Sequence, residues 1–445
     1  MNEFKKAFQE ILRYPSAIIG LVTVLLFTAL AIYAIIALPY SKAIQLWRGG
    51  ENEWYQNPKF AAPLWTNYFS RVKKPVSFVL NDKDTAMQKE VIKGEQNTSR
   101  INITYTFDYP YDTFPQDIIL YFKATYREKQ PFVSIYWLTP DGRKIRISDF
   151  GVDANQTFRI SQDEKLKRRL GDLDPMMGLF INEDGKTPVK GEYKLLLEAV
   201  AFEEDSDLNA EMVFHGALAG NFGTDHQRRD LMIPMLWGAP VALAFGLIAS
   251  LGTSILTMVI AAAGAWYGGW VDELIQRVTE VNLVLPFFSI LVMVGVFYSR
   301  STWVILSVTV LLSIFTGSIK VLRSTFIQIK ESSYIEAARA YGTSDMRIIF
   351  NYMIPRMIPL LIPGVVSSVP AFVFLEATLA VLGLGDPVLP TWGRMIQEAE
   401  SHGALYKGYY YWILEPAILL MGSGLGFAML GFALDRIFNP KLRDL

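Results

Sequence analysis

The chain has 445 residues, of which 51% are hydrophobic, 13% are aromatic and only 19% are charged. This composition is too apolar for an ordinary soluble enzyme of this length, so we expect a lipid bilayer as the solvent. The formal net charge of -1 gives no electrostatic reason to expect a nucleic-acid partner. The absence of cysteine excludes disulfides, thiolate metal sites and cysteine nucleophiles.

The first long apolar segment, residues 17–38, contains no charge and follows Lys5, Lys6 and Arg13. It predicts a membrane helix that enters from the cytoplasmic side, after a cytoplasmic tail at residues 1–16. A cleaved signal peptide is the alternative. Its apolar region usually ends after roughly 7 to 15 residues, however, and this segment is longer.

Residues 39–215 form a polar segment that is long enough to be a domain of its own. Several of its stretches alternate with the period of a β-strand and are rich in β-branched and aromatic residues. These stretches are residues 100–109, 117–126, 131–138 and 191–202. We therefore predict a β-rich, sandwich-like domain between the first and second membrane helices, with a short helix near Asp163 to Leu170.

Five further apolar segments follow an outer amphipathic connection at residues 216–234. They lie at residues 231–271, 281–299, 301–319, 357–375 and 416–434. Each is long enough to cross a hydrocarbon layer of ~30 Å at ~1.5 Å rise per residue. The chain is therefore predicted to be an α-helical integral membrane protein with about six transmembrane helices, five of them in a core at residues 235–445.

The distribution of Lys and Arg predicts the orientation of these helices. With the N-terminus inside, most basic residues of the connections fall on the inner side, many of them in residues 320–356. The short outward loops hold only Arg300, Arg394 and Lys407. Both ends of the chain are therefore expected in the cytoplasm, and the β-rich domain on the extracytoplasmic side.

The inward segment at residues 320–356 contains a helix–turn–helix pattern, SSYIEAARAYGTSDMRIIFNYMIP, at residues 332–355. Ser333 followed by Glu336 predicts a capping box, the alanines favour helix, and Gly342 is a suitable terminator. A second helix is expected to lead to Pro355 at the membrane. This arrangement on the cytoplasmic face is suited to docking another protein.

The spacing of this segment resembles the "EAA" signature of the membrane subunits of binding-protein-dependent ATP-binding cassette importers. Tyr352 and Ile354 depart from it, because the family has an aliphatic residue and a leucine at these positions. The resemblance implies a type I importer permease fold, in which the helix at the glycine inserts into a cleft of a cytoplasmic ATPase. The residues implied in ATPase coupling are Glu336, Ala337, Ala338, Arg339, Gly342, Phe350 and Pro355.

Two further stretches are similar to the C-type permeases of dipeptide, oligopeptide and nickel importers. One resembles the "GTD...GRD" motif on the outer face, with Arg228 in place of its glycine. Its residues are Gly223, Thr224, Asp225, Arg229 and Asp230. The other runs from Glu376 through Gly385 to Trp392-Gly393 and resembles the fifth span and its following loop. The large β-rich insert is the main departure from this family.

Glu376 interrupts an apolar span, and intramembrane carboxylates are costly enough to be candidates for function. It lies in a pathway or gate, or else it packs against neighbouring helices that satisfy it. Gly383, Gly385 and Trp392 are further candidates for the pathway or gate.

Two other signals are assigned no function. Gly185-Lys186-Thr187 is not a phosphate loop, because Phe180 stands where that pattern requires glycine. The three histidines do not form a tight cluster with carboxylates in the sequence, so no metal site is predicted. The chain is expected to hold no cofactor, and ATP and Mg are expected in partner ATPase subunits.

The resemblance implies a permease subunit in the inner or plasma membrane of a prokaryote, with no enzymatic activity of its own. Its implied partners are a second, non-identical permease, two cytoplasmic ATPases and an extracytoplasmic solute-binding protein. Short peptides are the leading cargo, and nickel or oligosaccharides are alternatives. Two other classes stay open, namely a membrane-anchored receptor or envelope protein that acts through its β domain, and an ion-driven secondary transporter.

Overall fold

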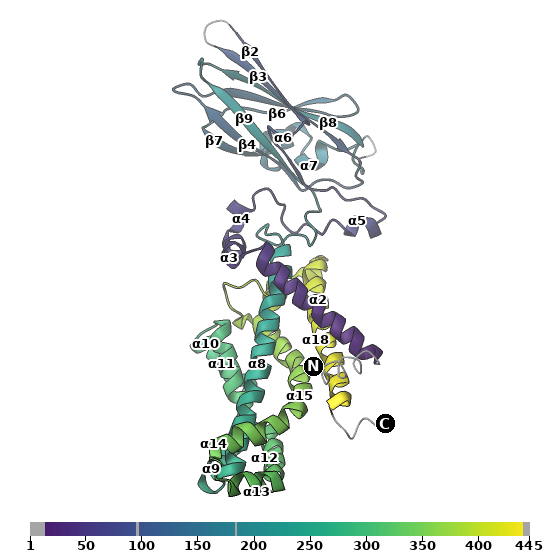
Figure 1. Cartoon of the computed structure of the whole chain (residues 1–445). Helices are drawn as coiled ribbons and strands as arrows, with labels where there is room; N and C mark the ends of the chain where they lie inside the picture. The colour runs from purple at the N-terminus through teal and green to yellow at the C-terminus, as the bar shows by residue number, and fades with distance from the viewer. Residues whose placement is uncertain (1–13, 95–97, 183–184, 439–445) are drawn as a thin grey trace. The chain divides into compact units, whose positions relative to one another are not determined.

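The computed structural model describes residues 14–94, 98–182 and 185–438 (Figure 1). The first part of the predicted cytoplasmic tail and the last residues of the chain lie outside this range. The chain divides into a membrane unit, Met1–Arg48 with Ile233–Leu445, and a β unit, Gly49–Met232. This division places nearly all of the predicted outer connection, residues 216–234, in the β unit.

The described residues of the membrane unit form helices joined by short connections. Its α-helices are α2 (Pro15–Ala37), α3 (Tyr40–Arg48), α8 (Met232–Tyr267), α9 (Gly269–Val284), α10 (Phe287–Phe297), α11 (Thr302–Ile314), α12 (Gly317–Lys330), α13 (Ser333–Ala340), α14 (Asp345–Ile348), α15 (Ile354–Leu379), α16 (Trp392–Ser401), α17 (Ala404–Lys407) and α18 (Tyr411–Phe438). Two π-helical turns, η2 (Ile349–Met353) and η3 (Ala380–Leu384), flank α15.

Among the described residues, four helical stretches are long and apolar enough to cross a membrane alone. They are Pro15–Ala37, Met232–Tyr267, Asp345–Leu384 and Tyr411–Phe438. Two bent pairs, α9 with α10 and α11 with α12, raise the number to six if each pair is one span. The prediction of about six membrane helices is therefore confirmed.

The two middle spans differ from the prediction. α10 has 11 residues and α11 has 13, so they reach only about 17 and 20 Å at 1.5 Å per residue. Each is too short to cross alone and forms a bent pair with a more polar helix, at 78° for α9–α10 and 50° for α11–α12. The prediction that residues 281–299 and 301–319 each cross as one helix is therefore wrong.

The two bends have identifiable causes. Pro286, which lacks a backbone N–H, stands between α9 and α10. At the other bend, the Asn282 side-chain amide donates to the carbonyls of Leu312 and Phe315, at 2.9 and 2.8 Å. These bonds satisfy carbonyl groups at the end of α11 that no longer have a helical partner. A side chain of α9 therefore stabilises the bend between α11 and α12.

Glycines on α18 allow α2 and α15 to pack closely against it. A Cβ atom on Gly20 of α2 would lie 2.6 Å from the Leu430 nitrogen, and one on Gly426 would lie 2.7 Å from the Thr23 side chain. Gly431 faces Ser367 of α15 in the same way. Close backbone approach through small residues is a common means of helix association in membranes, where burial from water does not drive it.

The β unit contains two antiparallel sheets. The four-stranded sheet has the order β1-β9-β4-β7, and the five-stranded sheet has the order β2-β3-β8-β5-β6. The strands are β1 (Phe78–Leu80), β2 (Met87–Lys93), β3 (Ser99–Tyr109), β4 (Asp117–Thr125), β5 (Phe132–Leu138), β6 (Lys144–Gly151), β7 (Asn155–Arg159), β8 (Gly191–Ala201) and β9 (Asp207–His215). Its short helices are α4 (Gly50–Glu53), α5 (Thr66–Phe69), η1 (Ile160–Gln162), α6 (Glu164–Arg169) and α7 (Pro175–Gly178).

The core of the β unit takes buried residues from both sheets, as the predicted sandwich requires. Along β3 buried positions alternate with more exposed ones, and the rings of Phe107, Trp137 and Phe214 meet in the core. The buried Tyr105 hydroxyl donates to the Ala210 carbonyl at 2.6 Å, which links the two sheets. The predicted helix near Asp163 is also confirmed, because the Asp163 carboxylate caps α6 by accepting from Leu166 N.

Candidate functional site

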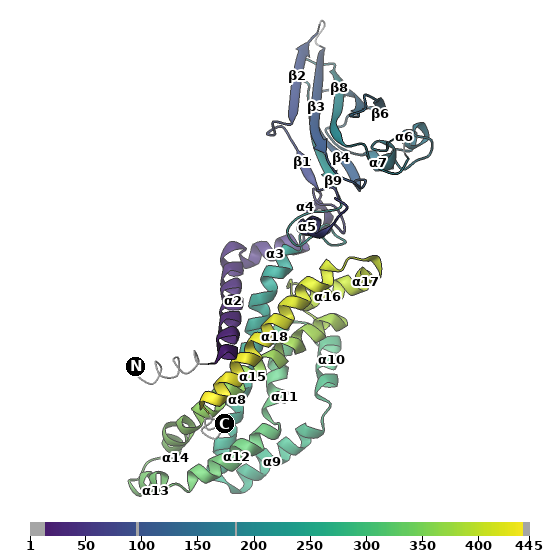
Figure 2. The same ribbon diagram turned by 90° about the vertical axis from the view of Figure 1, so that its right-hand side faces the viewer.

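α13 and the turn after it form a hook, residues 333–343, at one end of the membrane unit beside α9, α12 and α14 (Figure 2). The predicted capping box is wrong. The N-cap of α13 is Ser332, which makes no side-chain cap bond. The Ser332 hydroxyl instead donates back to the Ile329 carbonyl of α12. α13 therefore begins one residue early and is tied to the preceding helix.

Gly342 ends α13 as predicted. Its φ of +73° is in the left-handed region, where glycine is unstrained. The Thr343 amide donates to the Ala338 carbonyl at 3.1 Å, and the Gly342 amide donates to the Arg339 carbonyl at 2.9 Å. These two bonds form a Schellman motif, which closes the helix in a tight and well-defined turn.

The hook has a buried face and an exposed face. Ile335 and Ala338 belong to a core cluster with buried residues of α8, α12, α14 and η2. Tyr341 is 91% exposed, and nothing lies within 4 Å of a Cβ built on Gly342. The predicted coupling residues therefore fall into two groups, one buried in the core of the unit and one exposed on its surface. Ala338 is buried, and the exposed ones are Glu336, Ala337, Arg339, Gly342, Phe350 and Pro355.

Trp266 of α8 contacts the hook, and no pattern in the sequence indicated this residue. Trp266 is 6% exposed and lies one residue before the end of α8. The Arg339 guanidinium stands 4.3 Å from the centre of its ring. Lys330 donates to the carbonyls of Ala265 and Trp266, at 3.1 and 2.8 Å, and so caps the end of α8. No sequence spacing indicated that these residues meet.

An ion pair joins the two bent pairs at the same end of the unit. The Arg323 guanidinium of α12 binds both carboxylate oxygens of Asp272 on α9, and the Nε–Oδ1 distance is 2.5 Å. A bidentate pair of this kind restricts orientation as well as distance. The hook therefore rests on helices that are themselves connected.

The structure only partly brings together the pathway candidates. Glu376 is buried in α15, and its carboxyl group lies near the Thr391 side chain. Glu376 and Gly385 both line a small cavity of about 10 Å³, which is the space of about one water molecule. Gly383 has a φ of +80°, which marks the break at the end of α15.

Trp392 does not line that cavity. Its indole N–H donates to the Met235 carbonyl at 3.0 Å, and its ring meets Phe27 edge to face at 5.9 Å. Gly238 makes room for the ring, since a Cβ there would lie 2.2 Å from it. Trp392 therefore fastens α16 to α8 and α2, which is a packing role.

The outer-face motif fixes the chain just before α8. Thr224 accepts from the Ala61 amide at 3.0 Å and donates to the Pro58 carbonyl at 2.8 Å. Asp225 and Arg229 form a buried ion pair with an Nε–Oδ2 distance of 2.5 Å. Burial raises the pKa of the Asp225 carboxyl, and the Arg229 guanidinium opposes this shift. These contacts hold the motif against residues 58–61.

The two ends of the motif shape the backbone. Gly223 has a φ of +78°, and the Asp230 carboxylate accepts from the Met232 amide at 2.8 Å at the start of α8. Burial also raises the pKa of Asp230. All five predicted motif residues thus come together in one ordered turn, in which they bind one another and neighbouring backbone.

Comparison with known proteins gives the family of the chain. Residues 254–444 match the family described as binding-protein-dependent transport system inner membrane component. A Brucella suis protein named for a peptide transport system permease is 32% identical over 227 residues, which cover 50% of this chain and 74% of that protein.

Two other relatives bear more specific names. The dipeptide transport system permease protein DppC of Bacillus subtilis is 27% identical over 223 residues, covering 50% of this chain and 69% of the relative. The glutathione transport system permease protein GsiD of Pectobacterium atrosepticum is 26% identical over 266 residues, which cover 57% of this chain and 86% of the relative. The chain therefore belongs to the binding-protein-dependent transport system inner membrane components, the multi-pass permease subunits of ATP-binding cassette transporters.

Proposed function

We propose that the chain imports short peptides, together with a second, non-identical permease, two cytoplasmic ATPases and an extracytoplasmic binding protein. The observation that carries this proposal is the hook, a closed glycine turn on a short helix whose outer face is exposed. The names of the relatives support peptide cargo, because dipeptides, oligopeptides and glutathione are all short peptides. ATP and Mg would be bound by the ATPases and not by this chain.

The orientation of the chain is part of the proposal. The basic residues of the inner connections support a cytoplasmic location for α9, α12, α13 and both chain ends. The β unit then lies on the extracytoplasmic side, where the binding protein delivers its cargo. The proposed parts of the chain are the cytoplasmic tail at residues 1–16, the first transmembrane helix at 17–38, the extracytoplasmic β-rich domain at 39–215 and the outer connection at 216–234. The permease core follows at 235–445 and contains the coupling segment at 320–356.

The packing of the hook suggests how movement would pass into the membrane. Closure of the ATPases would displace α13, whose buried face contacts the end of α8. The Arg339–Trp266 contact and the Lys330 bonds would carry that displacement into α8. The helical unit would then alternate between inward-open and outward-open forms. Gly223, Thr224, Asp225, Arg229 and Asp230 would hold the outer start of α8.

Peptide cargo is tested by uptake in native cells that lack the chain. We expect uptake of radiolabelled tri-alanine to fall at least tenfold on deletion and to return with the wild-type gene. Excess unlabelled tri-alanine should compete, whereas nickel ions and maltotriose should not. Loss of nickel or maltotriose uptake with peptide uptake intact would refute peptide as the cargo.

The role of Glu376 is tested by removing its charge but keeping its shape. We propose a packing role, so Glu376→Gln should retain the packing near Thr391 and keep peptide uptake within about twofold of wild type. Glu376→Ala removes that packing and enlarges a cavity, and should destabilise the chain by about 1–3 kcal/mol in thermal unfolding. Glu400→Gln, at an exposed position of α16, is the matched control. A tenfold loss of uptake in Glu376→Gln would assign the carboxylate to a gate instead.

A further inference from the structure

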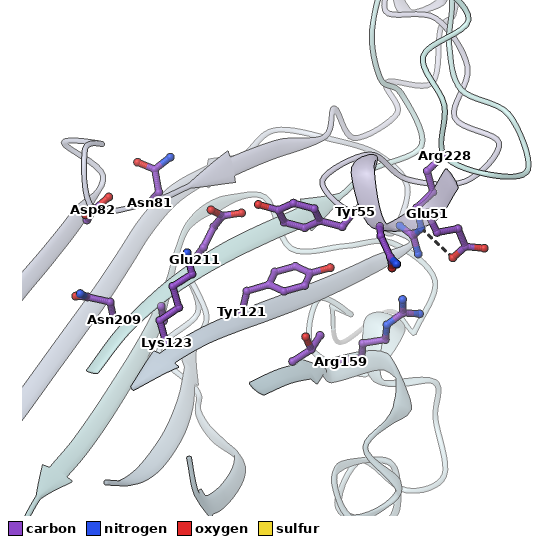
Figure 3. Close-up of a pocket in the computed structure, with 13 residues that line it drawn as sticks. Glu51, Tyr55, Asn81, Asp82, Tyr121, Lys123, Arg159, Asn209, Glu211 and Arg228 are labelled. Carbon is purple, nitrogen blue, oxygen red and sulfur yellow. Dashed lines mark ion pairs between the residues drawn. The ribbon is translucent and has the colours of Figure 1, made fainter. Parts of the chain in front are cut away.

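The β unit contains a cleft of about 550 Å³, which lies within the ~300–1,000 Å³ range of small-molecule sites (Figure 3). Its floor is one face of the four-stranded sheet. Glu211 of β9, Tyr121 of β4 and Thr157 of β7 are direct neighbours across adjacent strands and so share this face. The segment that carries Glu51 and Tyr55 forms a wall together with Arg228.

Charges are separated along this cleft. Arg159 and Arg228 lie at one end with Glu51, which amounts to two positive groups and one negative group. Asp82 and Glu211 lie towards the other end with Lys123, which amounts to two negative groups and one positive group. The rings of Tyr55 and Tyr121 lie between the two ends, with their centres 4.7 Å apart. The cleft therefore has a positive end, a negative end and an aromatic middle.

Arg228 occupies the positive end under backbone strain. Its φ of +66° is in the left-handed region, which a non-glycine residue rarely adopts. Arg228 also stands where the related "GRD" motif has glycine. An arginine at such a position needs a compensating role for its side chain, and here that side chain reaches the cleft.

Neighbouring groups hold the Arg228 side chain in place. Its Nη1 donates to the Asn57 carbonyl at 2.7 Å and to His215 Nδ1 at 3.2 Å. Burial, reinforced by Arg228, lowers the pKa of His215 to about 3, so the ring is neutral at pH 7 and can accept this bond. The His215 Nε2–H donates in turn to the Tyr55 carbonyl at 3.2 Å. The guanidinium is therefore positioned before any ligand arrives.

The positive end has capacity for an anion. Arg159 forms no ion pair among the residues that the structure describes, and its charge only opposes the burial that raises the pKa of the Asp117 carboxyl. The carboxylate of Glu51 lies 3.6 Å from Arg228 Nε and is itself shared with Lys59 at 2.5 Å. At the other end, Glu211 accepts from the neutral Gln56 side chain at 3.0 Å and forms no ion pair among the described residues. Two guanidiniums and two carboxylates thus face opposite ends of one cleft.

We propose that this cleft binds a short peptide with free termini. The ligand carboxylate lies at Arg159 and Arg228, the ammonium group lies at Glu211 and Asp82, and the peptide packs on Tyr55 and Tyr121. The zwitterionic chemistry rests on the cleft alone, whereas its identity with the transported cargo rests on the proposed function. The β unit is then a cargo-binding module of the permease itself.

The size of the sheet limits the length of the peptide. From β1, which precedes Asp82, to β7, which carries Arg159, there are three strand-to-strand steps of about 4.8 Å each, roughly 14 Å in all. Side chains reach inward from both ends and shorten this span. An extended peptide covers about 3.3–3.6 Å per residue, so a tripeptide or tetrapeptide fits.

The test is calorimetric titration of the full-length chain in lipid nanodiscs with tri-alanine. We expect Arg159→Gln, Arg228→Gly and Glu211→Gln each to raise the Kd at least tenfold, because each removes a charge-assisted contact. Arg228→Gly suits the left-handed backbone and so keeps the fold, which thermal unfolding checks. Arg168→Gln, at an exposed position of α6 outside the cleft, is the matched control and should bind like wild type.

End-blocked ligands assign the two ends of the cleft. Tri-alanine amide lacks the carboxylate, so it should bind at least tenfold more weakly than tri-alanine, and Arg159→Gln should not weaken it further. N-acetyl tri-alanine lacks the ammonium group, so it should also bind at least tenfold more weakly than tri-alanine, and Glu211→Gln should not weaken it further. Equal binding of free and blocked peptides, tri-alanine binding unchanged by the three variants, or preferential binding of maltotriose would overturn the proposal.

This result is separable from the uptake result. Uptake of tri-alanine with no binding to the β unit would refute the cleft and leave the proposed function standing. Binding that depends on both ends, without any chain-dependent uptake, would refute peptide import and leave the cleft standing.

Discussion

Gly342→Arg is expected to separate the chain from its ATPase subunits and to reduce their co-purification at least tenfold. Position 342 is the C′ residue of a Schellman motif with a φ of +73°. Any side chain there adds strain of about 1 kcal/mol, which a folded membrane unit can tolerate. A long charged side chain at the tip of the hook would also block insertion into a partner's cleft. Peptide uptake should therefore disappear while the chain stays folded.

Gly408→Arg is the matched control for this experiment. Gly408 has a φ of +80°, and nothing lies within 4 Å of a Cβ built on it. An arginine at this position therefore meets the same kind of backbone strain and the same open space as an arginine at position 342. It follows α17, away from the hook, and should leave both co-purification and uptake within twofold of wild type. If Gly342→Arg retained the ATPases and peptide uptake, the proposed coupling site would be wrong.

Trp266→Ala is expected to uncouple ATP hydrolysis from transport and to lower peptide uptake at least tenfold while the ATPases stay bound. Trp266 lies in the last turn of α8, and the Arg339 guanidinium of the hook stands 4.3 Å from the centre of its ring. Removing the ring deletes this cation–π contact and leaves a cavity under the hook, at a cost of about 3–5 kcal/mol. The exposed face of the hook would be unchanged, so docking would continue without transmission into α8.

Trp270→Ala provides the comparison for this variant. Trp270 lies four residues further along the chain, near the start of α9, and is 75% exposed, so its removal should change uptake by less than twofold. Trp266→Phe keeps an aromatic face for Arg339 and should recover part of the uptake. The measurements are ATPase activity and peptide uptake of the same preparations. If Trp266→Ala reduced ATPase co-purification as much as it reduced uptake, the cause would be a folding defect. The proposed transmission of movement from the hook into α8 through Trp266 would then be refuted.

Local sequence patterns predicted those parts of the fold that local physics determines. The apolar run of α2 and the alternation of β3 each follow from one repeating feature, and Gly342 ends its helix because few other residues adopt that backbone. The bend between α11 and α12 could not be read in this way. It depends on Asn282, a residue of another helix, which hydropathy along the chain does not sense.

The candidate site shows the same limit. The sequence identified the hook but not the contact of Arg339 with Trp266, since 73 positions separate them and no motif spans the gap. It identified Arg228 as a departure from a glycine, and only the structure shows the left-handed backbone and the cleft that this side chain enters. Residues that act through tertiary contacts need coordinates, whereas residues that act through backbone geometry leave a trace in the sequence.

The glycine contacts of α18 have a mechanical consequence. α2 and α15 approach α18 so closely that one added methyl group at Gly20 or Gly431 would collide with its neighbour. Helices that interlock at this distance cannot slide past one another, so these three would act as the stationary frame of the transporter. Shape changes during a cycle would then fall to α8, which receives the movement of the hook, and to the two bent pairs, α9–α10 and α11–α12, whose bends already give them hinges.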